Sequence, residues 1–493
     1  MKYSLLASTA AAVLACSPLV AGRNHAHEAY LQRRQAALSS SVVPAQTSSA
    51  APAASSSGAA SASAPAPATT TAAAASSASA PAVTHPPTTA SNNDIPPLEQ
   101  ITMGGPIQPP VPLPSTYSAG ASPPLKGAVP LPTKALTIAN YPTMDKVPPI
   151  DSPEVKGWLA EVAAKNPKIP LIKQTVDGSC GSDPALAANG SATGNCWWTC
   201  GGCTRDTDIT VCPDKLAWGL TYDDGPSPYT PKLLNYLDQH SLNATFYVVG
   251  SRVISRPEIV QYEYMKGHEL SVHTWSHSAL TTLTNEQIVA ELGWTRKAIH
   301  DVTGVTPLTM RPPYGDIDDR VRAIAMAMNL TPVIWTGVGQ DEFDTSDWRI
   351  PGGTANGTSS YAAFNKILTK ATTLDTGFIV LQHDLYQETV DLAVGYILPD
   401  ALGHDPKFAL SSVSHCLHQP LEDAYVETST KGSTGGNGTT GGGYGSGGSS
   451  SGGSGSGTGS GASGTSGAGR TVGMSLGVGA VAGFAAMFLG LFI

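Results

Sequence analysis

Two adjacent carboxylates, Asp223 and Asp224, end a short apolar run and stand directly before Gly225-Pro226. The run 216–222 has the length and composition of a buried strand, and the Gly-Pro pair stops it. Two carboxylates at the end of a buried strand repel each other and lose hydration, which is costly unless a cation compensates. The pair is therefore either a solvated turn or part of a site that holds a metal ion or a cationic side chain.

Two histidines, His273 and His277, follow further along the chain at a spacing of four residues. On a helical turn this spacing puts both imidazoles on one face, where they can reach one metal ion. Two surface histidines could share the spacing, but the apolar run 270–272 places this pair at a strand end, like the aspartates. An aspartate and two histidines form a three-ligand zinc set that leaves positions for water and substrate. Thr274 follows His273, so the His-Glu-x-x-His signature of zinc proteases is absent.

The elements that must position these residues alternate between short apolar runs and helical patterns, which is typical of parallel βα units in an α/β fold. We expect strands at 216–222, 244–249, 269–272, 307–310, 331–336 and 377–382. We expect helices at 230–240, 257–266, 285–302, 317–328, 361–373 and 386–398. The reactive residues follow the expected strands, and the C-terminal ends of strands carry the active sites of (β/α) barrels.

Three further stretches complete the pattern: Arg311-Pro312-Pro313-Tyr314-Gly315, Asp344-Thr345-Ser346-Asp347-Trp348 and Ile379-Val380-Leu381-Gln382-His383. In this order the five stretches resemble the polysaccharide deacetylases with a NodB-homology domain (carbohydrate esterase family 4), and most of all the fungal chitin deacetylases. The resemblance covers 212–416, under half of the chain, and its one visible departure is Tyr222, where many members have Phe. It implies an irregular (β/α) barrel of about seven strands.

The residue types then assign the roles. Asp224, His273 and His277 would hold a divalent metal, Zn²⁺ in the first place and Co²⁺ in the second, through one oxygen and two nitrogens. The metal would polarise an acetamide carbonyl and lower the pKa of a bound water. Asp223 would contact the substrate and take the water's proton as general base. Arg311 would pair with Asp223 and orient it, a role compatible with a purely structural ion pair.

The remaining roles belong to the last three stretches. The backbone N–H of Tyr314 would help to hold the oxyanion. His383 would be the general acid that protonates the leaving amine, so its pKa must stay near or above the working pH. The resemblance points to Asp347 as the carboxylate that keeps that pKa high. Trp348 and Leu381 resemble the walls of a small acetyl pocket, and simple core packing would explain both nearly as well.

Cysteine usage predicts an oxidising compartment. Cys16 lies in a secretory signal, which leaves an even number of cysteines and predicts three disulfides. Because a closed barrel brings its first and last strands together, we predict a Cys212–Cys416 pair. The other four would staple an N-terminal cap, residues 150–211, and are Cys180, Cys196, Cys200 and Cys203.

Two features of this cap have more than one interpretation. The spacing Cys200-x-x-Cys203 also fits a zinc knuckle or a redox pair, although secretion favours disulfides. Trp197 and Trp198 either pack on the disulfides or extend a sugar-binding face.

The flanks predict a secreted, surface-anchored protein. Residues 1–21 form a signal peptide, and 22–149 a Ser/Thr/Ala/Pro-rich disordered stalk and linker. Its last part, 94–149, carries scattered Leu and Ile and is either an extended linker or partly packed on the domain that follows. After the catalytic domain at 212–427, a Gly/Ser-rich spacer spans 428–469. The small, apolar segment 470–493 fits a glycosylphosphatidylinositol signal with attachment within 463–469, the alternative being a transmembrane helix. Five sequons predict N-glycosylation, at Asn189, Asn243, Asn329, Asn356 and Asn437.

The net charge of −9 with few basic runs argues against nucleic acid as a partner. A secreted, anchored, monomeric deacetylase at a eukaryotic cell wall would act on chitin, a polymer of N-acetylglucosamine, to give chitosan and acetate. A xylan esterase or a peptidoglycan deacetylase would carry the same motifs. A hypothesis of another class is a wall mannoprotein whose barrel only binds polysaccharide.

Overall fold

The structure is a computed structural model that describes residues 95–339 and 341–430. The predicted signal peptide, residues 22–94 of the stalk, the spacer from residue 431, the anchor signal and the Asn437 sequon lie outside the described residues. Across the described ranges, no helix is both long enough and apolar enough to cross a membrane.

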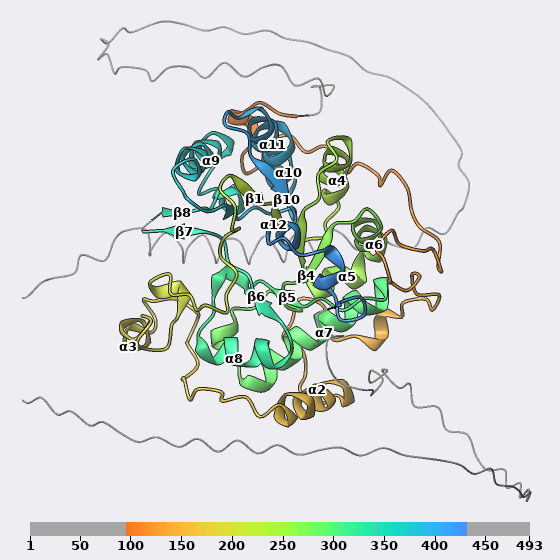
Figure 1. The fold of residues 1–493 in the computed structure, drawn as a ribbon, viewed down its shortest axis with the longest axis vertical. Helices are drawn as coiled ribbons and strands as arrows, with labels where there is room; N and C mark the ends of the chain where they lie inside the picture. Colours follow the sequence, from red (N-terminus) through yellow and green to blue (C-terminus); the bar gives the residue numbers. More distant parts are fainter. Residues whose placement is uncertain (1–94, 340, 431–493) are drawn as a thin grey trace, which may run out of the picture. The chain divides into compact units, whose positions relative to one another are not determined.

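Five parallel strands form the sheet that carries the reactive residues (Figure 1). In spatial order they are β2 (Thr221–Asp223), β3 (Thr245–Val248), β4 (Glu269–Val272), β5 (Thr309–Met310) and β6 (Thr331–Pro332). All neighbours pair in parallel, so the carboxyl ends of all five strands lie at one edge. The strands are short and largely buried, as the sequence predicts for parallel βα units.

A second parallel sheet has the order β10 (Ala409–Ser411), β1 (Ala217–Gly219) and β9 (Phe378–Ile379). An isolated parallel bridge between Asp223 and His383 connects the chain beyond β9 to the end of β2. A small antiparallel pair, β7 (Gly337–Val338) and β8 (Asp341–Glu342), completes the described strands. The parallel α/β fold agrees with the prediction. Closure into a barrel of about seven strands stays a prediction, because the described strands form separate sheets linked by isolated bridges.

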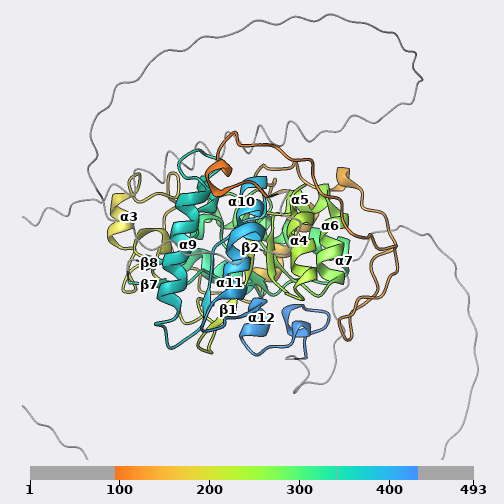
Figure 2. The ribbon, with the colours of Figure 1, turned by 90° about the horizontal axis from the view of Figure 1, so that it is seen from above.

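Helices flank the strands where the sequence predicts them. Figure 2 shows α9 on one side of β1 and β2, with α4, α6 and α7 on the other. The expected helices are α4 (Thr230–Gln239), α6 (Pro257–Met265), α7 (Asn285–Thr303), α8 (Asp319–Ala327), α9 (Gly357–Ala371) and α10 (Gln387–Leu392), the last continued by a π-helical turn (Ala393–Ile397) and α11 (Leu398–Gly403). The long helix α7 begins at a capping box of Thr284 and Gln287 and ends at Gly304 in the left-handed region.

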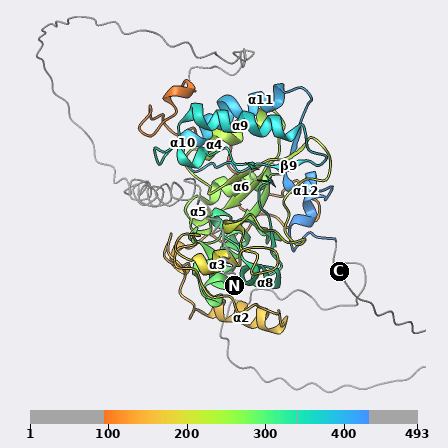
Figure 3. The ribbon, with the colours of Figure 1, turned by 90° about the vertical axis from the view of Figure 1, so that its left-hand side faces the viewer.

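Within the described ranges, four α-helices are not among those predicted: α2 (Pro153–Ala164), α3 (Pro184–Ala188), α5 (Gly250–Ser255) and α12 (Val413–Cys416). In Figure 3, α2 and α3 lie on the opposite side of the fold from α9 and α11. The indole of Trp158 on α2 packs edge-on against Trp294 of α7, at a centroid distance of 5.4 Å. Ser152 caps α2 and Pro153 starts it, which are local signals that the surrounding Pro-rich composition hides.

Residues 95–149 pack on the domain, so of the two interpretations of this segment the structure has the packed one and not a disordered linker. Ile101 and Leu131 are 2% and 1% exposed. Backbone contacts bind this segment to distant helices: Gly357 N donates to Ile101 O (2.7 Å), and the Tyr396 hydroxyl donates to Pro96 O (2.9 Å). The scattered Leu and Ile side chains bury enough apolar surface to hold the segment in place, which average composition does not show.

The structure contains three disulfides among the described residues. Cys212 pairs with Cys416, the expected pair, and joins the chain before β1 to α12. In the cap, Cys180 pairs with Cys200 and Cys196 with Cys203. Cys200 and Cys203 therefore belong to two separate disulfides and do not pair with each other. Trp197 and Trp198 are buried in packing contacts.

The four described sequon asparagines, Asn189, Asn243, Asn329 and Asn356, are exposed. Their glycosylation stays a prediction.

Candidate active site

The reactive residues gather at the carboxyl edge of the parallel strands. Asp223 ends β2, and Asp224 turns out of it with a left-handed φ of 79°. His273 follows β4, Arg311 follows β5, and the Asp223–His383 bridge brings the last stretch alongside β2. The side chains at these strand ends are all buried: Asp223, Asp224, His273, Arg311 and His383.

Asp224, His273 and His277 form a candidate metal centre. The Asp224 Oδ1 atom lies 3.3 Å from His273 Nε2 and 2.9 Å from His277 Nε2. One ligand atom from each residue lies within 4.8 Å of the others. Burial acts to raise the pKa of Asp224, but the two histidines hold that pKa well below its usual range, so the carboxylate stays ionised.

The second ring nitrogen of each histidine has its own partner. His273 Nδ1 lies 2.7 Å from the Arg311 carbonyl oxygen, and His277 Nδ1 lies 2.9 Å from the Tyr314 hydroxyl. When Nδ1 carries the proton and donates it to these oxygens, Nε2 is left to bind a metal. One carboxylate oxygen and two imidazole nitrogens fit a zinc-type centre with open positions.

Glu291 of α7 supports the segment between the two histidines. Its Oε2 atom accepts hydrogen bonds from the backbone N–H groups of Trp275 (2.7 Å) and Ser276 (2.9 Å). Within this segment Thr274 and His277 adopt left-handed φ values of 64° and 58°. Such a backbone costs about 1–3 kcal/mol per residue and persists only where surrounding contacts impose it. This role of Glu291 is not predictable from the sequence, since one glutamate within a helical pattern carries no special signal.

Asp223 and Arg311 form a buried ion pair beside this centre. Arg311 Nη1 donates to Asp223 Oδ1 (2.7 Å) and to Thr221 Oγ1 (2.9 Å). The guanidinium carbon lies 4.1 Å above the centroid of the Tyr247 ring. The carboxylate of Asp223 is thus fixed in direction by a cation that has little freedom of its own. Thr221 and Tyr247 are further contributors that the sequence analysis does not predict.

His383 and Asp347 form a second charged pair. His383 Nδ1 lies 2.7 Å from Asp347 Oδ1, and the His383 backbone N–H donates to Asp347 Oδ2 (2.8 Å). Burial acts to lower the pKa of His383, but Asp347 and the carboxylates of Asp224 and Asp223 raise it to about 10. The imidazole is therefore protonated at neutral pH and can donate a proton through Nε2.

The predicted acetyl-pocket residues lie next to this pair. Leu381 is buried, and Trp348 is half-buried with its Nε1 atom donating to Asp344 Oδ2 (3.3 Å). Tyr314 has a left-handed φ of 62°, which a sequence alone does not reveal. The structure thus brings together the residues that the sequence singles out for catalysis and metal binding, and their roles stay predictions. The contact of the Tyr314 hydroxyl with His277 is an addition.

Asp384, the neighbour of His383, is a buried acid that the sequence analysis does not predict. Burial raises its pKa to about 7, although Thr230 donates a hydrogen bond to its Oδ2 atom (2.5 Å). A Cβ atom at Gly225 would lie 2.3 Å from the same oxygen. The glycine after the aspartate pair is therefore required by close approach.

Comparison with known proteins agrees with this geometry. The profile of the family described as polysaccharide deacetylase matches residues 210–333. Chitin deacetylase 1 of Cryptococcus neoformans var. grubii is 57% identical over 345 residues, which is 69% of this chain and 72% of that relative. This chain belongs to the polysaccharide deacetylase family.

Other relatives align over shorter stretches. A chitin deacetylase of Amylomyces rouxii is 39% identical over 236 residues, or 46% of this chain and 54% of that relative. The solved chitin deacetylase of Colletotrichum lindemuthianum is 27% identical, with a TM-score of 0.40 over 45% of this chain and 95% of that one.

Proposed function

We propose that this chain is a metal-dependent hydrolase that removes N-acetyl groups from the N-acetylglucosamine units of chitin, giving chitosan and acetate. One observation carries the proposal: a base fixed by Arg311 and an acid fixed by Asp347 both adjoin an Asp-His-His centre at one strand edge. Chitin is favoured because the relatives at 57% and 39% identity are named chitin deacetylases.

The residues present fit a divalent cation. Bound by Asp224, His273 and His277, a Zn²⁺ or Co²⁺ ion would polarise the acetyl carbonyl and lower the pKa of a water molecule. The protein supplies an ionised carboxylate and two imidazoles whose Nδ1 atoms already have oxygen partners.

The proton transfers belong to the two charged pairs. The oxygen of the attacking water bonds to the carbonyl carbon while Asp223 accepts a proton from that water. Arg311 keeps the Asp223 carboxylate directed at the water. The Tyr314 N–H donates to the oxyanion that forms on the substrate. His383 then gives its Nε2 proton to the nitrogen as the C–N bond breaks. Acetate and a free amine leave, and solvent exchange then removes the proton from Asp223 and returns a proton to His383.

Trp348 and Leu381 would form the walls of the acetyl pocket. Trp348 directly follows Asp347 in the sequence and Leu381 stands two residues before His383, and Thr345 N donates to Leu381 O (3.4 Å). Their position beside the general acid supports a role in admitting a small acyl group.

We further propose that the chain works as a secreted monomer in the cell wall, held at the outer face of the plasma membrane by a glycosylphosphatidylinositol anchor. The support is the sequence: a signal at 1–21, a stalk, sequons and a small, apolar tail at 470–493. The cap at 150–211 and the catalytic domain at 212–427 would act together on the polymer.

The test is acetate release from chitin oligomers by the full secreted chain, before and after chelation and with Zn²⁺ added back. We expect release that disappears with chelation, returns with Zn²⁺ and is absent in Asp223→Asn. The matched control is Asp341→Asn, since the Asp341 side chain is 69% exposed and should not affect activity. Release from acetylated xylan alone would replace chitin as the substrate, and binding without any release would favour a polysaccharide-binding protein.

A further inference from the structure

Asp316 is a buried carboxylate with four hydrogen-bond donors around it. It is 1% exposed. Its Oδ1 atom accepts from Trp197 Nε1 (2.7 Å) and Thr199 Oγ1 (3.0 Å). Its Oδ2 atom accepts from the backbone N–H (2.9 Å) and the hydroxyl (2.6 Å) of Thr281. A carboxylate so fully satisfied inside a protein is an ordering element, because removing any partner leaves a buried polar group unpaired.

These donors belong to different parts of the chain. Trp197 and Thr199 come from the disulfide-bonded cap, while Thr281 lies just after His277 and Asp316 itself just after Tyr314. The cap also contacts the Thr281 segment directly, since Thr175 N donates to Thr281 O (3.0 Å). One side chain therefore joins the cap to both segments that leave the candidate metal centre.

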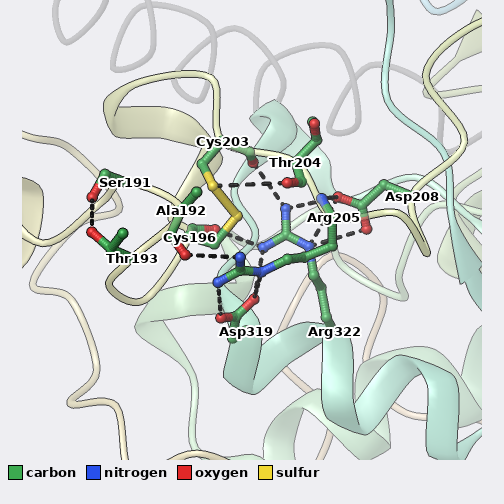
Figure 4. Close-up of a disulfide and its surroundings, with 10 residues drawn as sticks. All are labelled: Ser191, Ala192, Thr193, Cys196, Cys203, Thr204, Arg205, Asp208, Asp319 and Arg322. Carbon is green, nitrogen blue, oxygen red and sulfur yellow. Dashed lines mark hydrogen bonds and ion pairs between the residues drawn. A yellow bond between two sulfur atoms is a disulfide. The ribbon is translucent and has the colours of Figure 1, made fainter. Parts of the chain in front are cut away.

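The cap is itself fixed to the helix that follows the Tyr314 segment. Figure 4 shows the Arg322 side chain of α8 reaching the Cys196–Cys203 disulfide, where Nη1 donates to Cys196 O (2.6 Å) and Nη2 to Cys203 O (3.1 Å). In the same view Arg205 of the cap forms a bidentate ion pair with Asp319, in which Nε donates to Oδ1 (2.9 Å) and Nη2 to Oδ2 (2.6 Å). The cap cannot shift without breaking charge-assisted hydrogen bonds.

Close packing extends these contacts to Tyr314. A Cβ atom at Gly315 would lie 2.3 Å from the Trp198 ring, and the Trp198 backbone N–H donates to Ile317 O (2.9 Å). Tyr314 is held in the left-handed region, which contacts from outside its own segment must impose. Its hydroxyl lies 2.9 Å from His277 Nδ1.

We propose that Asp316 is a positioning residue that fixes the Tyr314 segment and the segment after His277 to the disulfide-bonded cap, and thereby sets the His277 ligand for the metal. The inference rests on the proposed metal-dependent function, but its principal readout is metal affinity, which needs no substrate. The cap then contributes to the metal centre without providing a ligand.

The test compares four full chains: the unaltered protein, Asp316→Asn, Tyr314→Phe and the double variant. An amide has one acceptor oxygen, so its NH2 group must face the donors either of Thr281 or of Trp197 and Thr199, and one pair of contacts is lost at nearly constant volume. We expect the Zn²⁺ dissociation constant, measured by competition with a chelator, to rise about 10- to 100-fold, as for other residues that orient metal ligands. The kcat should fall more than the KM changes.

The double variant shows whether the effect passes through Tyr314. If it does, adding Asp316→Asn to Tyr314→Phe should reduce the Zn²⁺ affinity much less than Asp316→Asn does alone. Unchanged Zn²⁺ affinity in Asp316→Asn, or fully additive losses in the double variant, would overturn the proposal. Failure of the unaltered chain to release acetate would instead reject the proposed function and leave the affinity measurement intact.

A milder pair of variants covers the case in which Asp316→Asn does not fold. Trp197→Phe removes the indole donor to Asp316 and keeps an aromatic ring. Trp218→Phe is the matched control, because Trp218 is equally buried and its Nε1 has no hydrogen-bond partner among the described residues. Trp197→Phe should lose more thermal stability, because it also removes a buried hydrogen bond, and only this variant should weaken Zn²⁺ binding. Equal Zn²⁺ affinities in the two variants contradict the proposal.

Discussion

The Nδ1 atom of His383 lies 2.7 Å from the Oδ1 atom of Asp347, and both residues are buried. Asp347 also accepts the His383 backbone N–H, so one carboxylate fixes both the ring and the main chain of the proposed general acid. This contact determines over which pH range the acid can work.

The first prediction concerns pH. The pKa of His383 is raised to about 10, so the protonated, active form is present below that value and is lost as pH rises through it. Asp347→Asn removes the neighbouring negative charge, so the alkaline limb of the kcat profile should move to lower pH. A cation bound at Asp224 would lower the pKa of His383, because it offsets the charge of one of the carboxylates that raise this pKa. An alkaline limb that stays in place in Asp347→Asn contradicts the assignment.

The second prediction concerns Arg311. Its planar guanidinium bonds Asp223 and Thr221 at once and stacks on Tyr247, which a lysine cannot reproduce. Arg311→Lys should lower kcat by at least about tenfold with little loss of folding. Arg311→Met leaves Asp223 buried without its cation and should lower the free energy of unfolding by about 3–5 kcal/mol. Steady-state kinetics and urea unfolding measure the two effects, and a fully active Arg311→Met would exclude the orienting role.

Much of the site could be predicted from the sequence, because the chemistry depends on a few residue types at strand ends. Asp223, Asp224, His273, His277 and His383 need only the parallel order of the strands to come together. The left-handed backbone of Tyr314, which places its hydroxyl on His277, depends on packing against the cap and leaves no local signal. The role of Glu291 leaves no local signal either, since it exists only after α7 packs beside the histidines.

The fold divides in the same way. The expected strands and long helices have clear hydrophobic periodicity, and most boundaries differ by a few residues. Residues 95–149 lack such periodicity, and their order comes from contacts with distant elements such as α9. Average composition therefore indicated disorder where tertiary packing determines the outcome.

The third prediction compares two disulfides of different loop length. Cys212 and Cys416 are 204 residues apart, whereas Cys196 and Cys203 are 7 apart. In the chain-entropy description, loss of the long cross-link costs about 5 kcal/mol and loss of the short one about 2 kcal/mol. Denaturant unfolding of the double alanine variants at each pair measures both free energies. Equal losses for the two pairs would show that strain or residual structure, and not loop entropy, controls their contribution.

The fourth prediction concerns the segment 95–149. Ile101 is 2% exposed and packs on the domain, whereas Ile107 in the same segment is 86% exposed. Ile101→Ala should lower the free energy of unfolding by about 2–5 kcal/mol, because it removes buried methyl groups and leaves a cavity. Ile107→Ala makes the same chemical change on the surface and should alter that free energy by less than about 0.5 kcal/mol. Thermal and urea unfolding of the full chain measure both. Equal free energies of unfolding for the two variants would show that the segment is only a linker. The expected difference would show that it is part of the folded domain that carries the active site.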